Sequence, residues 1–443
     1  MMDDNVTNFA KHAMLGFKVY VGQQLKIQPN SGYRFIKVKD SPRVMCIYIL
    51  TNPVYFKPLS LMEPELSMAM GLTADLTARI RRFEGRVIRV EVPKPKDLCF
   101  SIQDKDLPHR EHKAAIGSDL DGRSIFVDLE QPLQAHILIA GMTGSGKTIL
   151  QKNMAIALSL ANDIDRFRLC VIDVSKRGMR WKDLNKKAHL LHPVVVDEVE
   201  ALKMAAWFVK ELDMRAGKNF VPPAAPRYAL VIDEFADLVE GSIGPAIVPH
   251  LVKLTQMGRE YGMHCIISTQ HPTVSALGSS LAKRQFGVRF VGKMDDGLAA
   301  KTAAGIEDCG AQYLSGAGDF VSVKEDRVTR FQVAIPTSGS INQMPDDGDH
   351  QIDLSGIEDP EMILRNCRVG RPEEPLDYTV VGQFVAKLAE KGMPASFHTA
   401  GSWIIPRIAP GKAERHIKLA KIVLDEVKNR GYEVIKIRPG ESV

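Results

Sequence analysis

The chain has 443 residues, which is enough for two or three domains and at least one large hydrophobic core. Apolar residues make up 45% of it and charged residues 25%, as in ordinary globular proteins, so a fibrous or largely disordered chain is excluded. The net charge of +5 at pH 7 permits an anionic partner but does not require one.

The sequence predicts a cytoplasmic protein with no membrane segment. The longest apolar run near the N-terminus, Val44–Leu50, is far too short to span a bilayer, and the N-terminus has no signal-peptide pattern. The six cysteines are scattered, without a C-x-x-C pair or a histidine cluster beside them. We therefore expect reduced thiols rather than disulfides or zinc ligands.

The N-terminal part predicts a small α+β domain. Residues 1–44 contain short segments broken by Gly, Pro and Asn, and they give no firm assignment. Further on, strand-like runs at Met45–Leu50 and Gly85–Val92 lie on either side of a stretch with helical spacing, Leu66–Phe83. We therefore expect a small α+β domain over residues 45–112.

Strands and helices alternate between residues 113 and 336, which is the pattern of a parallel α/β sheet. Several of the strands are almost wholly apolar, as expected for strands covered on both faces. They are predicted at Ala135–Ala140, Leu169–Val174, Tyr228–Ile232, His264–Ser268 and Val288–Gly292. The apolar spacing of Glu198–Arg215 predicts a helix.

The last hundred residues change character. Residues 337–376 contain nine Asp or Glu against three Arg, with Pro and Gly throughout, and predict an acidic linker with little packed structure. Residues 377–443 predict a small C-terminal domain, with helices at Thr379–Glu390 and Ala413–Asn429 and a short strand at Tyr432–Ile437.

The segment Ile137–Thr148 contains the pattern G-x-x-x-x-G-K-S/T between an apolar strand and a helical segment, the context that a P-loop requires. The glycines let backbone N–H groups converge on phosphate oxygens, and the helix N-terminus adds partial positive charge. We expect Lys147 to reach the β- and γ-phosphates of ATP and Thr148 to bind Mg²⁺. The predicted nucleotide-binding residues are Gly141, Met142, Thr143, Gly144, Ser145, Gly146, Lys147, Thr148 and Ile149.

A second nucleotide motif follows roughly 85 residues later, where the strand Tyr228–Ile232 ends in Asp233-Glu234. This ending is typical of a Walker B motif, in which the Asp holds Mg²⁺ and the Glu polarises the attacking water. Taken alone it also fits a strand cap or a surface acid, but the P-loop upstream favours the catalytic interpretation. Asp237 is expected to be a solvated helix residue.

Two further candidates lie near the predicted strand His264–Ser268. Gln270 follows its carboxyl end, where it can sense the γ-phosphate or position water, although a simple strand terminus also fits. Arg259 precedes the strand, either as an ordinary surface residue or as an arginine finger that reaches the nucleotide of a neighbouring subunit. Arg289 is the other candidate for that finger.

Together these motifs resemble the FtsK/SpoIIIE family of DNA-translocating ATPases, in the broader HerA–FtsK group. The resemblance covers residues 110–336 well and residues 45–110 more weakly. The residues that carry it are His136–Thr148, Val171–Asp173 with Lys176, Val231–Leu238, Gly258–Pro272 and several positions of Gly310–Asp319. The run Gly117–Leu129 is similar to the family's lead-in to the P-loop.

The resemblance implies a RecA-like P-loop ATPase core that forms a homohexameric ring around double-stranded DNA, with a small α+β domain stacked on the core. It implies DNA contacts from pore loops, at Lys283 and Lys301 with Arg284 and Lys293 nearby, although each also fits a solvated side chain. The C-terminal domain is winged-helix in many members, so residues 377–443 are either such a DNA-binding domain or an oligomerisation or partner-binding tail.

The chain also departs from the family pattern. His271 stands where an Arg is common and Gly297 where a basic residue is common, so the contacts with DNA are expected to be weaker or differently distributed. Asp173-Val-Ser-Lys176 replaces the usual Asp-Pro-Lys, which predicts a different local turn.

The predicted function is an ATP-driven double-stranded DNA translocase, in the service of a mobile element, plasmid or virus. The alternative is a related motor for protein secretion, although such motors usually carry tandem ATPase domains and membrane segments. A nucleotide switch without motor activity is a third possibility, and the paired Asp233-Glu234 disfavours it.

Overall fold

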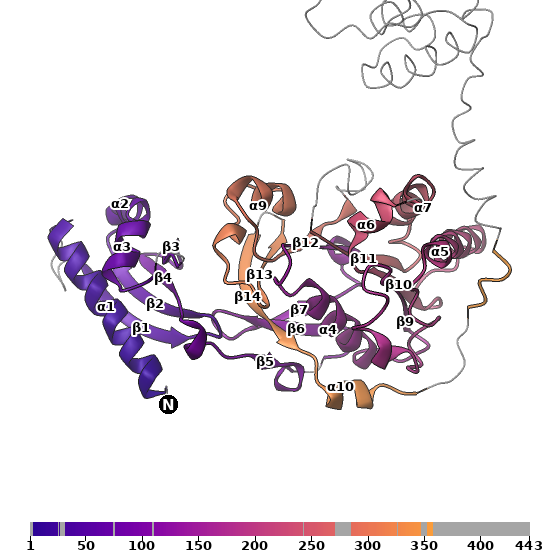
Figure 1. Cartoon of the computed structure of the whole chain (residues 1–443), viewed down its shortest axis with the longest axis horizontal. Helices are drawn as coiled ribbons and strands as arrows, with labels where there is room; N and C mark the ends of the chain where they lie inside the picture. The colour runs from indigo at the N-terminus through magenta and orange to yellow at the C-terminus, as the bar shows by residue number, and fades with distance from the viewer. Residues whose placement is uncertain are drawn as a thin grey trace, which may run out of the picture. The chain divides into compact units, whose positions relative to one another are not determined.

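The computed structural model describes residues 3–357 apart from 25, 27–31, 74–75, 109, 242, 271–284, 326 and 347–351. The chain divides into two compact units, Met1–Met362 and Ile363–Val443. The first unit contains a four-stranded sheet and a ten-stranded sheet (Figure 1). The predicted C-terminal domain, residues 377–443, lies outside the described residues.

The smaller sheet is antiparallel, with strand order β1-β2-β4-β3. Its strands are β1 (Tyr33–Asp40), β2 (Val44–Thr51), β3 (Arg79–Arg82) and β4 (Val87–Pro93). Helix α1 (Asp4–Gln24) buries Val6, Ala10, Ala13, Phe17 and Val21, one face at helical spacing, in the same core as the sheet. The segment without a sequence-based assignment therefore supplies α1 and β1 to this α+β unit. Short helices α2 (Phe56–Leu61) and α3 (Glu63–Ala69) complete it.

The predicted helix Leu66–Phe83 is wrong beyond its first four residues. Helix α3 ends at Ala69, and Gly71 then takes a left-handed conformation with φ +79°. Residues Arg79–Arg82 form strand β3, in which buried Ile80 alternates with more exposed arginines. The Glu63 carboxylate fixes the start of this strand, since it accepts from the backbone N–H of Ile80 at 2.7 Å. This contact between distant residues outweighs the local helical spacing.

The large sheet has the order β7-β6-β14-β13-β12-β8-β11-β10-β9, and β5 (Ile102–Gln103) pairs with β14. The five strands from β12 to β9 are parallel, and the other pairings along this order are antiparallel. The strands are β6 (Ala114–Asp119), β7 (Ser124–Val127), β8 (His136–Ala140), β9 (Phe167–Ile172), β10 (Arg227–Ile232), β11 (Met263–Thr269), β12 (Val288–Val291), β13 (Asp319–Lys324) and β14 (Arg327–Ile335). The predicted mixed α/β architecture is confirmed, and it is in line with a RecA-like core.

Helices pack on both faces of the parallel strands (Figure 1). Along β11, Ile266 belongs to the core that contains α4, whereas Cys265 and Ile267 face α7, because successive side chains of a strand point to opposite faces. The helices of this part are α4 (Lys147–Leu160), α5 (Glu198–Lys218), α6 (Phe235–Glu240), α7 (Gly244–Met257), α9 (Gly297–Ala304) and α10 (Ser338–Gln343). Short 3₁₀ turns occur at Pro53–Tyr55, Lys96–Leu98, Asp104–Asp106, Pro132–Gln134, Lys182–Leu184 and Ala311–Tyr313.

The start of the predicted linker is packed rather than extended. Ile341, Ile352 and Leu354 are buried, and the backbone N–H of Ile352 donates to the carbonyl of Leu191. These three apolar side chains stand among the acidic residues from which the linker was predicted, and their burial explains why this part of the segment packs. The rest of the predicted linker, from residue 358 on, lies outside the described residues.

Two other expectations concern the whole chain. None of the helices in the described part combines the length and the apolar character needed to cross a bilayer. The five cysteines of that part are all free thiols.

Two buried histidines, His136 on β8 and His264 on β11, make the stability of the core sensitive to acid. His136 accepts from the backbone N–H of Cys265, and His264 donates to the carbonyl of Ala135. Burial lowers the pKa of His136 to about 3 and the pKa of His264 to about 4, and nearby positive charges lower both further. Below pH 6.5 the unfolded chain therefore binds protons that the folded chain does not bind.

We expect the free energy of unfolding to fall as the pH is lowered from 6.5 toward 4, by up to about 1.4 kcal/mol per pH unit for each histidine. Urea unfolding across this range tests this for the wild type and for the double variant His136→Asn/His264→Asn, since Asn can supply either hydrogen bond without titrating. The double variant is expected to have the shallower dependence, and equal slopes would contradict the assignment.

Candidate functional site

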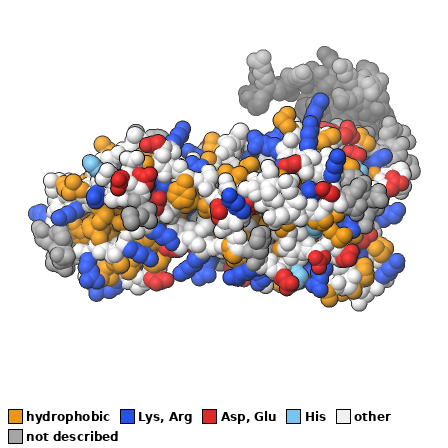
Figure 2. Space-filling view, turned by 90° about the horizontal axis from the view of Figure 1, so that it is seen from below, with side chains coloured by type: hydrophobic (Ala, Val, Ile, Leu, Met, Phe, Trp, Pro, Cys, Tyr) orange, Lys and Arg blue, Asp and Glu red, His pale blue; other side chains and the backbone are white. Residues whose placement is uncertain are grey.

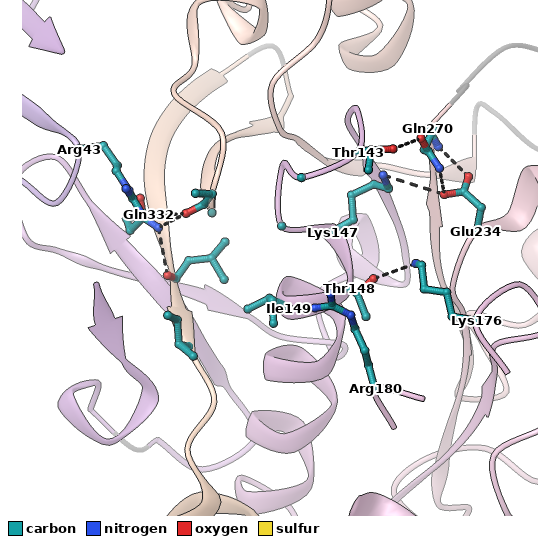
Figure 3. Close-up of a pocket in the computed structure, with 16 residues that line it drawn as sticks. Arg43, Thr143, Lys147, Thr148, Ile149, Lys176, Arg180, Glu234, Gln270 and Gln332 are labelled. Carbon is teal, nitrogen blue, oxygen red and sulfur yellow. Dashed lines mark hydrogen bonds and ion pairs between the residues drawn. The ribbon is translucent and has the colours of Figure 1, made fainter. Parts of the chain in front are cut away.

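Four parallel strands end at one edge of the large sheet, where the predicted motifs meet. The P-loop follows β8, Gln270 follows β11, Asp233-Glu234 follows β10 and Asp173 follows β9. A cavity of about 440 Å³ opens at this edge, and Lys147, Glu234 and Gln270 are among the residues that line it (Figure 3). The carboxyl edge of a parallel sheet is where α/β proteins bind ligands.

The P-loop has the backbone that its glycines permit. Gly144 and Gly146 have φ values of +82° and +106°, which side chains disfavour. A Cβ on Gly146 would lie 2.9 Å from the backbone nitrogen of Gly318. The loop before β13 supports the P-loop directly, because the N–H groups of Ala317 and Gly318 donate to the carbonyls of Gly144 and Ser145.

Lys147 begins helix α4 and points into the cavity (Figure 3). Its ammonium donates to the carbonyl of Gly141 at 2.7 Å and lies 4.0 Å from a carboxylate oxygen of Glu234. Burial lowers the pKa of Lys147, Glu234 opposes this shift, and Lys176 adds to it. The lysine is thus a buried cation that stands ready for an anion.

Thr148 and Asp233 form the predicted metal pair. The Thr148 hydroxyl donates to Oδ2 of Asp233 at 2.9 Å, and the Ser268 hydroxyl donates to Oδ1 at 2.9 Å. The carboxylate of Asp233 is almost wholly buried, and the Lys176 ammonium lies 3.2 Å from it. A buried carboxylate that is held by hydroxyl groups and attracts a cation suits Mg²⁺, which proteins bind through one or two carboxylates together with substrate phosphates.

No group of three or more His, Cys, Asp or Glu side chains that could hold a metal ion occurs among the described residues. The chemistry of the site agrees with this, since a nucleotide's phosphates supply further oxygen ligands to a P-loop Mg²⁺. The residues present fit Mg²⁺ bound together with a nucleotide.

Glu234 is held in place by Gln270. Its two carboxylate oxygens accept from the backbone N–H and from the side-chain amide of Gln270, each at 2.9 Å. Thr143 of the P-loop donates to the carbonyl oxygen of the same amide at 2.6 Å. Glu234 itself has a left-handed backbone, with φ +54°, and strain of this kind is found where a side chain must be aimed. The three residues form one chain of hydrogen bonds across the cavity (Figure 3).

Several residues of the site were not predicted from the sequence. Ser268 supports Asp233, and Gln151 ties α4 to the carbonyls of Ile232 and Ile266. Gln151 could have been found from the sequence, because it is a polar residue on the apolar face of a helix, three residues after Thr148. Arg43 reaches the same cavity from the N-terminal sheet and donates to the carbonyl of Ala317 at 3.3 Å, a contact between residues too far apart in sequence to be foreseen.

Other predicted residues lie elsewhere. Arg259 is 56% exposed and precedes β11, at the sheet edge opposite the cavity, where it lies 3.9 Å from Glu260. Arg289, the other candidate finger, lies on β12 and is partly buried. Lys293 follows β12, and its carbonyl accepts from the N–H of Met142, whereas Lys301 on α9 forms an ion pair with Glu307. Lys283, Arg284 and His271 lie outside the described residues.

The comparisons with known proteins agree with this geometry. Residues 102–221, which include the P-loop, match the model of the FtsK/SpoIIIE family. The chain is therefore similar to the FtsK/SpoIIIE family over this part of its length, and to DNA translocases of that family over a longer part. It is 25% identical over 351 residues to the DNA translocase FtsK of Borreliella burgdorferi, covering 70% of this chain and 42% of that protein. It is 29% identical over 306 residues to the DNA translocase FtsK of Helicobacter pylori, covering 63% and 35%.

The chain therefore spans less than half the length of these FtsK relatives. Among solved structures it is similar to the pCW3 conjugation coupling protein TcpA, in a monomer form with ATPγS. That similarity has a TM-score of 0.48 at 19% identity and covers 80% of this chain and 99% of TcpA.

Proposed function

We propose that the chain is an ATPase that drives double-stranded DNA through a homohexameric ring. The observation that carries the proposal is the Glu234–Gln270–Thr143 chain of hydrogen bonds beside the P-loop lysine. A site that only binds nucleotide does not need a buried carboxylate facing the phosphate-binding lysine. The match to the FtsK/SpoIIIE family model, and the similarity to relatives named DNA translocases, support DNA as the substrate.

Each residue has a chemical task in this proposal. Lys147 and the P-loop N–H groups hold the phosphates, and Thr148 and Asp233 hold Mg²⁺, which neutralises the charge of the phosphates. Glu234 accepts a proton from the attacking water or orients it. Because Gln270 bonds to both oxygens of Glu234, loss of the γ-phosphate is expected to be transmitted through Gln270 to the segment that follows it.

Arg259 acts in trans in this proposal. It lies at the amino end of β11, and the seven residues of that strand separate it from the nucleotide edge by roughly 20 Å. Its exposed guanidinium is therefore free to reach the nucleotide of a neighbouring copy, as an arginine finger does.

The proposed DNA contacts are Lys283, Arg284, Lys293 and Lys301. Lys293 is the best supported by its surroundings, because its backbone bonds to Met142 of the P-loop. Basic and acidic side chains are interspersed over the face in Figure 2, so a broad basic surface does not account for DNA binding there. Contacts in a ring would go to phosphates, which are sequence-independent and salt-sensitive.

ATP hydrolysis measured with and without long linear duplex DNA, across a salt series, tests the proposal. We expect duplex DNA to stimulate hydrolysis several-fold at low salt, with a loss of stimulation as salt rises because phosphate contacts release counterions. The Lys147→Ala variant is the control for contaminating ATPases and is expected to be inactive. If duplex DNA does not stimulate ATP hydrolysis at low salt, the assignment of DNA as the substrate is wrong and a protein-export motor is favoured.

A further inference from the structure

Lys176 is a charged residue of the site to which the proposed function gives no task. It lies in the loop after β9, and its side chain is 40% exposed and lines the cavity. Its ammonium lies 3.2 Å from Oδ2 of Asp233. It also lies 3.3 Å from the hydroxyl oxygen of Thr148, a contact drawn in Figure 3. These are the two oxygens assigned above to Mg²⁺, so the ammonium occupies the position of the cation.

The backbone of Lys176 is fixed while its side chain can move. Its N–H donates to the carboxylate of Asp173, and the carbonyl of Asp173 accepts from Gly178. Asp173 is fully buried, and its own N–H donates to Val195. The four-carbon side chain beyond this anchored loop has several rotatable bonds and ends in a compact charge.

The ammonium and Mg²⁺ cannot share this position. Mg²⁺ binds oxygen at 2.0–2.1 Å, and an ammonium that remained about 3 Å from the same oxygens would repel it. Lys176 must therefore leave when Mg²⁺ arrives. The cavity offers a destination, because the terminal phosphate of a bound nucleotide brings negative charge within reach of a lysine that lines the same wall.

We propose that Lys176 is a built-in counter-ion that fills the Mg²⁺ position while the site is empty and moves to the terminal phosphate of ATP when Mg²⁺ displaces it. The proposal rests on the proposed nucleotide and Mg²⁺ roles of the same site. It explains how the Asp233 carboxylate can be buried, since an unpaired buried charge is costly. The charge of Lys176 already reaches the P-loop, where it contributes to the lowered pKa of Lys147.

The test is a Mg²⁺ titration of the binding of ADP, which lacks the γ-phosphate of ATP and so isolates the displacement of the ammonium. In the Lys176→Met variant we expect half-saturation at a Mg²⁺ concentration about three- to fivefold lower than in the wild type, as expected for loss of one competing ion pair. Lys176→Arg keeps the charge and is expected to stay close to the wild type. Lys253→Met is the matched control, because it removes the same charge from an exposed ion pair with Asp213.

A second measurement reports the destination of the side chain. At saturating Mg²⁺, Lys176→Met is expected to lose several-fold of the preference for a non-hydrolysable ATP analogue over ADP, whereas Lys253→Met keeps it. A Mg²⁺ midpoint for Lys176→Met equal to that of Lys253→Met would overturn the proposal. If Mg²⁺ does not affect nucleotide binding even in the wild type, the assignment of Thr148 and Asp233 to Mg²⁺ is wrong. That result is distinct from a failure of the Lys176 proposal alone. Thermal unfolding of each variant checks that the fold is retained.

Discussion

Replacing Glu234 with Gln is expected to lower the rate of ATP hydrolysis by about 10²–10⁴-fold while nucleotide affinity stays within a few-fold of the wild type. Gln has the shape of Glu but cannot accept a proton from water at neutral pH. The phosphates are held mainly by Lys147 and the P-loop backbone, which the substitution leaves in place. Binding and turnover should therefore separate in this variant.

The hydrogen bonds around Glu234 are expected to survive the substitution, so that turnover is lost while nucleotide binding is kept. The Glu234 oxygens bond to Gln270, and the Gln270 amide bonds to Thr143, so a side chain of the same length keeps the network. With Gln at 234, the Gln270 amide can rotate to accept from the new NH₂ group, and the Thr143 hydroxyl can then accept rather than donate. We expect no collapse of the cavity.

Single-turnover hydrolysis and equilibrium binding of a fluorescent ATP analogue measure the two effects. Asp237→Asn is the matched control, because Asp237 is an exposed acid three residues further on and bonds to Ser175 outside the nucleotide cavity. It is expected to hydrolyse ATP at nearly the wild-type rate. Hydrolysis by Glu234→Gln at the rate of Asp237→Asn would show that Glu234 is not the base.

The parts of the site that could be predicted from the sequence are short motifs made of contiguous residues. Gly141–Thr148 must supply glycines, a lysine and a hydroxyl in fixed order, and Asp233-Glu234 must follow an apolar strand. Carboxyl ends of neighbouring parallel strands share one edge, so the parallel sheet that the sequence predicted brings these motifs together.

The unforeseen parts depend on contacts between residues distant in sequence. In the sequence Ser268 is an ordinary strand residue. Only the pairing of β11 with β10 brings the Ser268 hydroxyl to Asp233. In the same way, Glu63 decides that Arg79–Arg82 is a strand. Propensity and spacing describe short segments and carry no information on such pairings, so these features required the structure.

Arg330 joins the two sheets of the first unit through a buried cluster of charged side chains. The sequence alone does not predict this cluster either. The Arg330 guanidinium lies 2.9 Å from Glu91 on β4 and 2.7 Å from Asp319 on β13, and all three side chains are at least nine-tenths buried. Burial opposes ionisation of Arg330, but Asp319 and Glu91 raise its pKa above the ordinary value. Asp319 also accepts from Ser315, in the loop that supports the P-loop.

Arg330→Met is expected to lower the free energy of unfolding by about 3–5 kcal/mol, because it leaves the buried Asp319 carboxylate without its guanidinium partner, whereas Glu91 keeps its ion pair with Arg89. Arg327→Met is the matched control on the same strand, where the side chain is exposed, and is expected to change stability by less than about 0.5 kcal/mol. Urea unfolding at neutral pH measures both variants.

The double variant Asp319→Asn/Arg330→Met distinguishes an unpaired charge from a simple loss of packing, because Asp319 is the carboxylate that loses its ion pair. Removal of the stranded carboxylate should recover part of the lost stability, since replacing both partners of a buried pair costs less than removing one. Nucleotide affinity should fall with Arg330→Met as well, because Asp319 helps to shape the loop whose Ala317 and Gly318 hold the P-loop. Equal stability of Arg330→Met and Arg327→Met would mean that the buried cluster contributes no net stability to the junction between the N-terminal sheet and the nucleotide site.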